Sequence, residues 1–171
     1  MRIGNVPSVA VRLAETEQDV EAVRALCRAF VDWQLKEFPG MREKILAYFE
    51  PVSFARTLAD LPEIHARPKG AILLASLDGR PVGCVMYLEM QPGVAEVKRL
   101  FVEESGRGHG IGRILLAGML EQMRTDGYNE ACLDSAEFLT HAKQLYDRMG
   151  FVDIARAPDD PGHAYFMRYA L

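Results

Sequence analysis

Three glycines at alternate positions, flanked by two arginines, form the segment of this 171-residue sequence whose composition is best suited to chemistry. It reads Arg107-Gly-His-Gly-Ile-Gly-Arg113 and lies between an apolar, strand-like segment and an amphipathic, helix-like one. The first turn of a helix leaves about four backbone N–H groups unpaired and carries partial positive charge. Glycine lets a ligand approach these groups without meeting a Cβ. The segment therefore predicts a site for a diphosphate or a similar anion.

Two familiar phosphate-binding motifs do not fit this segment. A P-loop has Lys followed by Ser or Thr after its last glycine, whereas this sequence has Arg113-Ile114 there. The spacing Gly108-x-Gly110-x-Gly112 also differs from the G-x-G-x-x-G of dinucleotide-binding folds. On the glycines alone, a tight turn that serves only packing stays open as an alternative.

The overall composition excludes several classes of function. Charged residues make up 26% and hydrophobic residues 49%, with a formal net charge of -4, as in ordinary soluble globular proteins. There is no long basic run, so we expect no nucleic-acid partner. No stretch approaches the roughly 20 apolar residues of a membrane span, so we expect no membrane partner. We expect one domain over residues 1–171, with residues 1–8 as a short tail, located in the cytoplasm.

The three cysteines, Cys27, Cys84 and Cys132, are widely separated and flanked by apolar residues. An odd number at such spacing argues against a disulfide framework and against a zinc site. We expect them to be small core residues, with no metal bound. A nucleophilic cysteine is the alternative, and it is disfavoured because no histidine is near any of them in the sequence.

Hydrophobic periodicity predicts alternating strands and helices. Thr16 and Asp19 predict a capping box at the start of the first helix. We expect strands at 9–14, 71–76, 82–90, 95–102, 129–135, 151–156 and 163–170, and helices at about 16–38, 108–125 and 139–149, with short helices within 41–70. The fold class is α/β (α+β): a mixed, mostly antiparallel sheet of about six to seven strands flanked by about four helices.

Three segments, in this order, resemble the GCN5-related N-acetyltransferase (GNAT) superfamily. Residues 107–112 satisfy its signature R/Q-x-x-G-x-G/A, and "EVKRLFV" at 96–102 resembles its central strand. "AKQLYDRMGF" at 142–151 resembles its C-terminal motif, which has a tyrosine before Gly-Phe. The resemblance is strongest over 94–152, and within the superfamily it is closest to small bacterial acetyltransferases of unassigned substrate.

The resemblance implies acetyl-CoA as the acyl donor. In such enzymes the central strand carries a β-bulge, and its backbone pairs with the pantetheine arm; here that backbone belongs to Leu100, Phe101 and Val102. The following strand, at 132–134, would splay away and open a cleft. The pyrophosphate would contact the segment made of Arg107, Gly108, His109, Gly110, Ile111, Gly112 and Arg113.

The resemblance also implies two catalytic residues. Tyr146 occupies the family's tyrosine position and would donate a hydrogen bond to the leaving sulfur; ring packing is its alternative role. Glu96, at the start of the central strand, is the candidate base, and a purely structural ion pair with Lys98 or Arg99 is equally open. Period two places Glu96, Lys98 and Leu100 on one face. Of Lys98 and Arg99, we expect one to line the cleft and the other to face outward.

The acceptor is expected to be a primary amine of a small molecule or of a peptide or protein, attacked directly in a ternary complex. Acceptor contacts are expected from residues 30–70, from Tyr87 and from the loop 158–162. Trp33, Phe38, Tyr48 and Phe49 would wall a pocket or belong to the core. One alternative function is an acyl-CoA-binding sensor or regulatory module without catalysis. Another is an interaction domain, such as a homodimer built on the C-terminal strands.

Overall fold

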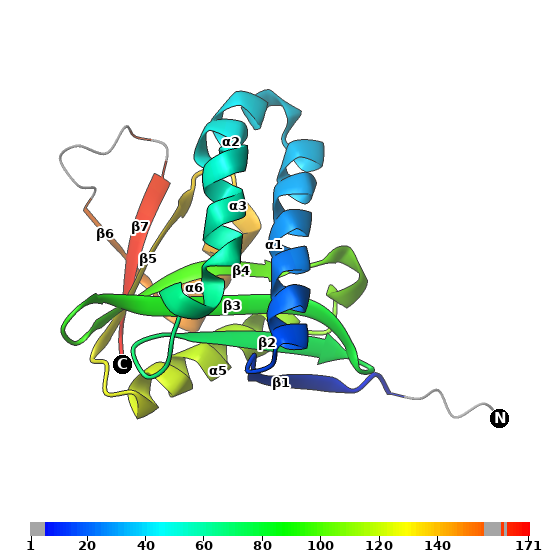
Figure 1. Ribbon diagram of the computed structural model, residues 1–171. Helices are drawn as coiled ribbons and strands as arrows, with labels where there is room; N and C mark the ends of the chain where they lie inside the picture. The colour runs from blue at the N-terminus through cyan, green and yellow to red at the C-terminus, as the bar shows by residue number, and fades with distance from the viewer. Residues whose placement is uncertain (1–5, 156–161, 163) are drawn as a thin grey trace.

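The computed structural model describes residues 6–155, 162 and 164–171, and its architecture is shown in Figure 1. In the described residues seven strands form one sheet in the order β1-β2-β3-β4-β5-β7-β6. All neighbouring strands pair antiparallel except β4 and β5, which pair parallel. The strands are β1 (Val9–Leu13), β2 (Ala71–Leu77), β3 (Arg80–Gln91), β4 (Val94–Val102), β5 (Glu130–Ala136), β6 (Val152–Ile154) and β7 (Ala164–Ala170). The predicted fold class is thus confirmed.

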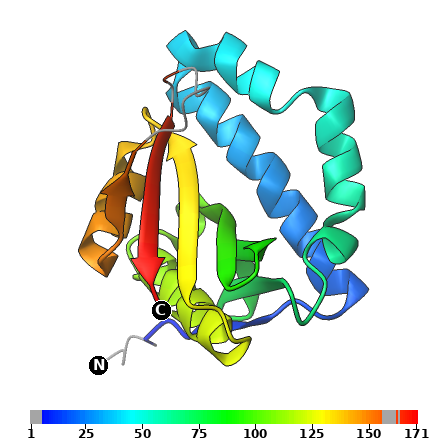
Figure 2. The same ribbon diagram turned by 90° about the vertical axis from the view of Figure 1, so that its left-hand side faces the viewer.

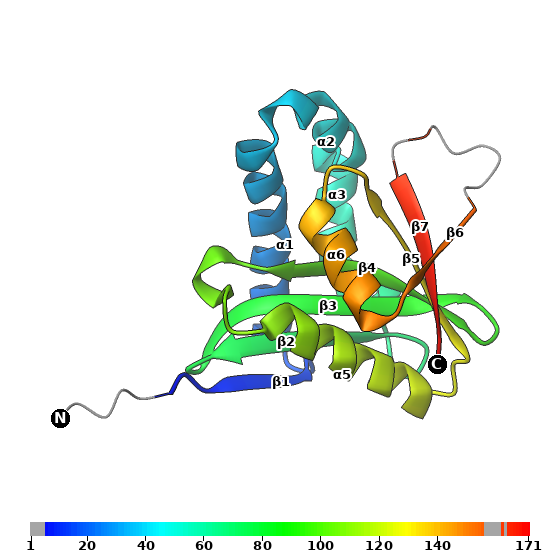
Figure 3. The same cartoon turned by 180° about the vertical axis from the view of Figure 1, so that it is seen from behind.

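Helices cover both faces of the sheet. α1 (Glu17–Glu37), α2 (Arg42–Tyr48), α3 (Pro51–Ala59) and α4 (Leu61–Ile64) lie on one face, whereas α5 (Ile111–Thr125) lies on the opposite face (Figures 1 and 3). α6 (Thr140–Met149) lies beside β5, β6 and β7, as Figure 2 shows from the side. Two short 3₁₀ turns, Pro39–Met41 and Glu104–Gly106, complete the elements. The predicted number of about four helices was too low, because Pro51 and Pro62 divide the segment 42–64 into three helices.

Side chains alternate across β3 because successive residues of a strand point to opposite faces. Val85 and Tyr87 pack against α5 and its neighbours, whereas Cys84 and Met86 pack against α1, α3 and α4. The sheet therefore separates two hydrophobic clusters. None of the helices in the described residues is both long enough and apolar enough to span a membrane.

The start of α1 is fixed by the predicted capping box. The Thr16 side chain accepts from the N–H of Asp19, and the Asp19 carboxylate accepts from the N–H of Thr16. Arg12 of β1 also donates to Asp19, at 2.6 Å. This hydrogen bond outweighs the effect of burial and lowers the pKa of Asp19. The cap thus joins the first strand to the first helix.

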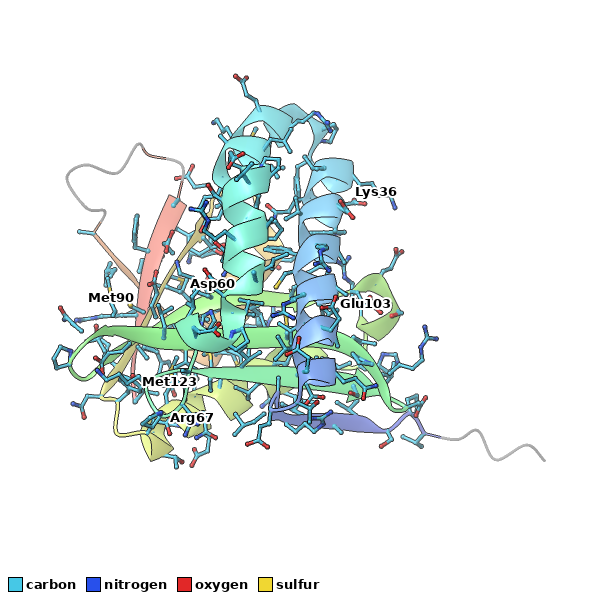
Figure 4. All side chains as sticks on the ribbon, viewed as in Figure 1. Lys36, Asp60, Arg67, Met90, Glu103 and Met123 are labelled. Carbon is cyan, nitrogen blue, oxygen red and sulfur yellow. The ribbon has the colours of Figure 1, made fainter. Side chains whose placement is uncertain are left out.

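Tyr87 does not lie where the sequence analysis expected it. Its side chain is fully buried on the α5 face, and its hydroxyl donates to Asp126 at the C-terminus of α5. Arg67, labelled in Figure 4, forms an ion pair with the same carboxylate. Tyr87 therefore ties the sheet to α5, and its buried side chain is on the face opposite α1–α4, which corrects its expected position beside residues 30–70. Because side chains alternate along a strand, the side chain of Tyr87 points to the other face of the sheet from those of Cys84 and Met86.

Candidate active site

The glycine segment forms an open loop in front of α5. Gly108 and Gly110 adopt left-handed backbone conformations, with φ of +81° and +71°. These conformations begin the helix at Ile111 rather than at the predicted Gly108. No atom lies within 4 Å of the position that a Cβ would take at either glycine. The glycines are therefore required by backbone conformation, and the space above them is open to a ligand.

Six consecutive N–H groups in this loop lack a backbone partner. Among the described residues, the N–H of Arg107 donates to Glu104, and the next backbone donor is Ile114, which donates to Gly110 at 3.1 Å. No carbonyl accepts from the N–H groups of residues 108–113. No side chain caps α5 at its N-terminus. Unpaired N–H groups at a helix start fit an anion such as a diphosphate.

The side chains of this loop offer fewer donors to an anion than its backbone does. The guanidinium of Arg107 lies 4.8 Å from the centre of the Trp33 ring, and its Nε donates to the carbonyl of Val102 at 3.2 Å. His109 is exposed, and its Nδ1 lies 3.4 Å from the carbonyl oxygen of Gly106. Arg113 is exposed on the first turn of α5. The loop is therefore chiefly a set of main-chain donors.

β4 and β5 separate beside this loop. Their parallel pairing extends only from Val94 opposite Glu130 to Glu96 opposite Cys132. Beyond this pair β4 continues to Val102 while β5 pairs with β7 on its other side. The backbone of Leu100, Phe101 and Val102 therefore has no β5 partner. We call the point of separation the strand fork; its open end lies toward the glycine loop (Figure 3).

A β-bulge interrupts β4 inside the fork. Cys84 pairs with Phe101 and Met86 pairs with Lys98, so two residues, Arg99 and Leu100, stand opposite Val85 alone. Arg99 has a positive φ of +48°. A bulge inserts one residue and thereby reverses the alternation of side chains beyond it.

The bulge overturns two expectations about β4. Leu100 packs with the cluster on the α5 face and not on the face of Glu96 and Lys98, because the extra residue reverses the alternation. Lys98 and Arg99 lie on the same face. Both charges act on His65, and that of Arg99 also acts on Cys27 and Cys84, which belong to the cluster packed against α1, α3 and α4.

Charged groups gather on this face at the fork. Lys98 Nζ lies 2.8 Å from a Glu96 carboxylate oxygen and 4.0 Å from one of Asp134. Both side chains of the closer pair are largely buried, at 28% and 21% exposure. Burial lowers the pKa of Lys98, but the hydrogen bond to Glu96 and the nearby charges outweigh it, so the pKa lies above its ordinary value. The predicted ion pair of Glu96 with Lys98 is thus present.

Cys132 also lies at the fork, in the segment 132–134 that the resemblance placed beside the cleft, and it is partly buried rather than a core residue as expected. Its Sγ is 3.3 Å from the sulfur of Met90, which is labelled in Figure 4. Burial and the surrounding carboxylates raise the pKa of Cys132 to about 11. The thiol is therefore protonated near neutral pH and poorly suited to act as a nucleophile. Cys27 and Cys84 are buried, as expected.

Tyr146 lies on the other side of the fork, on α6. The ring is 6% exposed and packs against Phe151 at a centroid distance of 5.6 Å. Burial raises the pKa of Tyr146, so its hydroxyl keeps its proton near neutral pH. The preceding residue, Leu145, lies against Gly112: a Cβ on this glycine would be 3.3 Å from Leu145. Tyr146 therefore belongs to a helix that adjoins the glycine loop.

Aromatic rings border the fork on the α1–α4 face. Phe101 of β4 lies 5.1 Å from Phe30 and 6.2 Å from Trp33, measured between ring centroids. Trp33 in turn contacts Phe38, and Phe38 contacts Phe138 in the β5–α6 connection. Phe49 is buried, whereas Tyr48 is 68% exposed. These rings form an aromatic cluster that also includes Phe30, Phe101 and Phe138, and Phe30 and Trp33 pack against the buried cluster on this face, which favours the core alternative for Trp33. The predicted acceptor loop at 158–162 lies outside the described residues except for Gly162.

Comparison with known proteins agrees with this geometry. The model of the acetyltransferase (GNAT) family matches residues 27–151. The chain is 34% identical over 105 residues to an IAA acetyltransferase of Azospirillum brasilense, a match that covers 61% of this chain and 67% of that protein. It is 30% identical over 112 residues to the N-acetylaspartate synthetase of Rattus norvegicus, a match that covers 64% of this chain and 37% of that protein.

A solved structure of a PaiA N-acetyltransferase from Thermoplasma acidophilum, in complex with coenzyme A, superimposes with a TM-score of 0.75 at 20% identity. The superposition covers 96% of this chain and 99% of the PaiA N-acetyltransferase chain. The resemblance noted in the sequence and the predicted fold are thereby confirmed. The two relatives above are named as an acetyltransferase and as a synthetase of an acetylated product. These names agree with the predicted enzyme class, an N-acetyltransferase. The chain belongs to the acetyltransferase (GNAT) family.

Proposed function

We propose that this protein transfers the acetyl group of acetyl-CoA to the primary amine of a small molecule or a peptide, by direct attack in a ternary complex. The observation that carries this proposal is the run of six unpaired N–H groups in residues 108–113, located at the open end of the strand fork. One relative is named for N-acetylaspartate, the product of acetylating an amino group, which supports an amine acceptor.

The residues of the loop and of β4 fit the donor in two ways. The amides of residues 108–113 would hold its diphosphate, and the left-handed glycines keep a Cβ away from the phosphate oxygens. The β4 backbone from Leu100 to Val102, which lacks a β5 partner, would pair with the amide-containing arm as another strand would. The three residues from Leu100 to Val102 extend about 10 Å along the strand. An extended arm could pair with them over this length.

When bound, the donor supplies a thioester, whose acetyl carbon is reactive toward amines. The bulge at Arg99 and Leu100 turns β4 N–H groups out of the ladder with β3, and one of them would polarise the thioester carbonyl. The Tyr146 hydroxyl, protonated because of its burial, would donate a hydrogen bond to the sulfur as the carbon–sulfur bond breaks. The products are an acetamide and free CoA thiol.

Glu96 is the residue that we propose accepts the proton of the amine, directly or through water. It ends the paired part of β4, with its side chain on the α1–α4 face beside Lys98. The acceptor would therefore enter from the α1–α4 face and the donor from the α5 face. An amine such as lysine has a pKa of about 10.4, so a proton must leave before attack. Cys132, with its raised pKa, has no place in this route.

The first experiment is calorimetric titration with coenzyme A and with acetyl-CoA, followed by release of CoA thiol in the presence of amines and peptide N-termini. Binding with turnover supports the proposal. Binding without turnover of any amine would instead fit a sensor that binds acyl-CoA without catalysis. Absence of binding at micromolar protein would eliminate both, and would leave an interaction domain.

The second experiment separates the two catalytic residues. Tyr146→Phe should lower kcat by about 10²-fold or more while CoA affinity stays within a factor of two or so, because only the transition state uses the hydroxyl. Glu96→Gln should lower kcat/KM most at low pH, where the amine is protonated. An unchanged rate in Tyr146→Phe would remove the tyrosine from the mechanism.

A further inference from the structure

Arg99 differs from three other arginines of the fold, of which Arg24 is likewise partly buried while Arg12 and Arg67 are more exposed. Arg12, Arg24 and Arg67 each form an ion pair with a carboxylate. Among the described residues, the guanidinium of Arg99 has no carboxylate partner, and its Nε is buried without a hydrogen-bond acceptor. A partly buried cation without a partner is unfavourable in the free protein. A ligand oxyanion would remove this penalty.

The backbone at Arg99 is arranged to hold this side chain on the α1–α4 face. Its φ of +48° lies in the left-handed region, which residues other than glycine rarely adopt. Without the bulge, Arg99 would point with its neighbour Val97 into the apolar cluster under α5. The bulge instead places it next to Lys98, on the face of the fork that the acceptor would use. Strained backbone of this kind is concentrated at functional sites.

The charges around Arg99 leave its own charge uncompensated. Glu96 is bonded to Lys98, and Asp134 also lies beside Lys98. His65, which caps the C-terminus of α4, donates its Nδ1–H to the carbonyl of Tyr87 and contributes no negative charge. The two thiols near Arg99, those of Cys27 and Cys84, are buried and form no ion pair with it among the described residues. An incoming anion therefore has one unmatched cation to bind.

We propose that the acceptor is an amine that also carries a carboxylate, such as an amino acid or a short acidic peptide, and that the guanidinium of Arg99 binds this carboxylate. The inference rests on the proposed acetyl transfer. A planar guanidinium matches a carboxylate with two parallel hydrogen bonds. Glu96 and Arg99 are three residues apart on β4, about 10 Å or less, which suits an amine and a carboxylate within one small molecule.

The test compares each of a set of L-amino acids with its own carboxamide, which has the same shape and no charge. CoA-thiol release is measured for the wild type, Arg99→Gln and Arg99→Lys. The control is Arg80→Gln, which removes an exposed arginine at the first residue of β3, five positions before Val85, the residue opposite the bulge. The wild type and Arg80→Gln should prefer the acid over its carboxamide by about tenfold or more in kcat/KM, the worth of a charge-assisted hydrogen bond.

In Arg99→Gln the ratio of acid to carboxamide should fall toward one, and Arg99→Lys should recover only part of it because an ammonium cannot form the planar pair. Equal use of acid and carboxamide by the wild type would overturn the inference, and so would a ratio that Arg99→Gln leaves intact. Circular dichroism and calorimetry with CoA verify that each variant folds and binds the donor.

A second measurement does not depend on turnover. Amino acids should raise the melting temperature of the CoA-bound wild type and of Arg80→Gln, and should not raise that of Arg99→Gln. If no amine in the panel is acetylated, the proposed function fails. The carboxylate site is then judged by this thermal shift alone, and its absence in the wild type would overturn the site as well.

Discussion

Gly110 offers the sharpest separation of binding from stability, because the chain contains a matched glycine elsewhere. Gly110 and Gly127 both have positive φ, +71° and +88°, and neither has an atom within 4 Å of an added Cβ. They lie at opposite ends of α5, one in the glycine loop and the other beyond the C-terminus of the helix. Alanine at either position imposes the same backbone strain, but only the first would face the bound diphosphate.

The magnitudes follow from this comparison. A left-handed alanine costs about 1–2 kcal/mol, of which the reduced entropy of the unfolded chain returns about 0.4–1 kcal/mol. Each variant should thus lose about 1 kcal/mol and melt about 2–4 °C lower than the wild type. In Gly110→Ala the Cβ would displace the phosphate from at least one N–H group. Loss of one charge-assisted hydrogen bond, about 2 kcal/mol, weakens CoA binding roughly 30-fold.

The assay is calorimetric titration of both variants with coenzyme A, together with thermal melting of each without ligand. We expect similar melting temperatures and a CoA affinity that falls only in Gly110→Ala. Wild-type affinity in Gly110→Ala would refute the assignment of the loop. An equal loss of affinity in Gly127→Ala would show that the stability of α5, and not the space above its first turn, controls binding.

Three further predictions concern buried charges and strain. Asp126→Ala removes a carboxylate that is 3% exposed and pairs with Arg67. Urea denaturation should show that the free energy of unfolding falls by about 2–3 kcal/mol. An unchanged midpoint would contradict the role of this contact. Burial lowers the pKa of His65 to about 4, whereas the unfolded side chain titrates near pH ~6.5. Folding stability should therefore be fully present above that pH and decline as the pH falls toward 4, and His65→Gln should flatten this part of the profile; an identical slope in the variant would exclude His65 as its source. Arg99→Gly should raise the free energy of unfolding by about 1 kcal/mol, because glycine adopts the left-handed conformation without strain. The same variant should lose the preference for acids over carboxamides. A destabilised variant would mean that the Arg99 side chain stabilises the fold.

Much of the fold was predictable because its signals are local. Thr16 and Asp19 form the capping box that their spacing predicts, and Gly150 ends α6 in a left-handed conformation as expected of a helix C-terminus. The order of strands and helices likewise follows from hydrophobic periodicity. The glycine loop could be found because its left-handed backbone conformations require glycines, which are visible in the sequence.

The errors arose where non-local geometry decides the outcome. Neither Arg99 nor Leu100 is a glycine, so only the family resemblance, and not the residues themselves, implied the bulge that reverses the alternation in β4. Strict period two therefore assigned Leu100 to the wrong face. The position of Cys132 depends on where β4 and β5 part, which is a property of strand pairing and not of either strand alone.

The most direct test of the account is a crystal structure of the protein with coenzyme A. The account predicts that the diphosphate oxygens lie about 3 Å from the amide nitrogens of residues 108–113, with the thioester-bearing arm along Leu100–Val102. A diphosphate bound elsewhere, for example in the groove between β1 and α5 lined by Val11, Ala117 and Gln122, would contradict it.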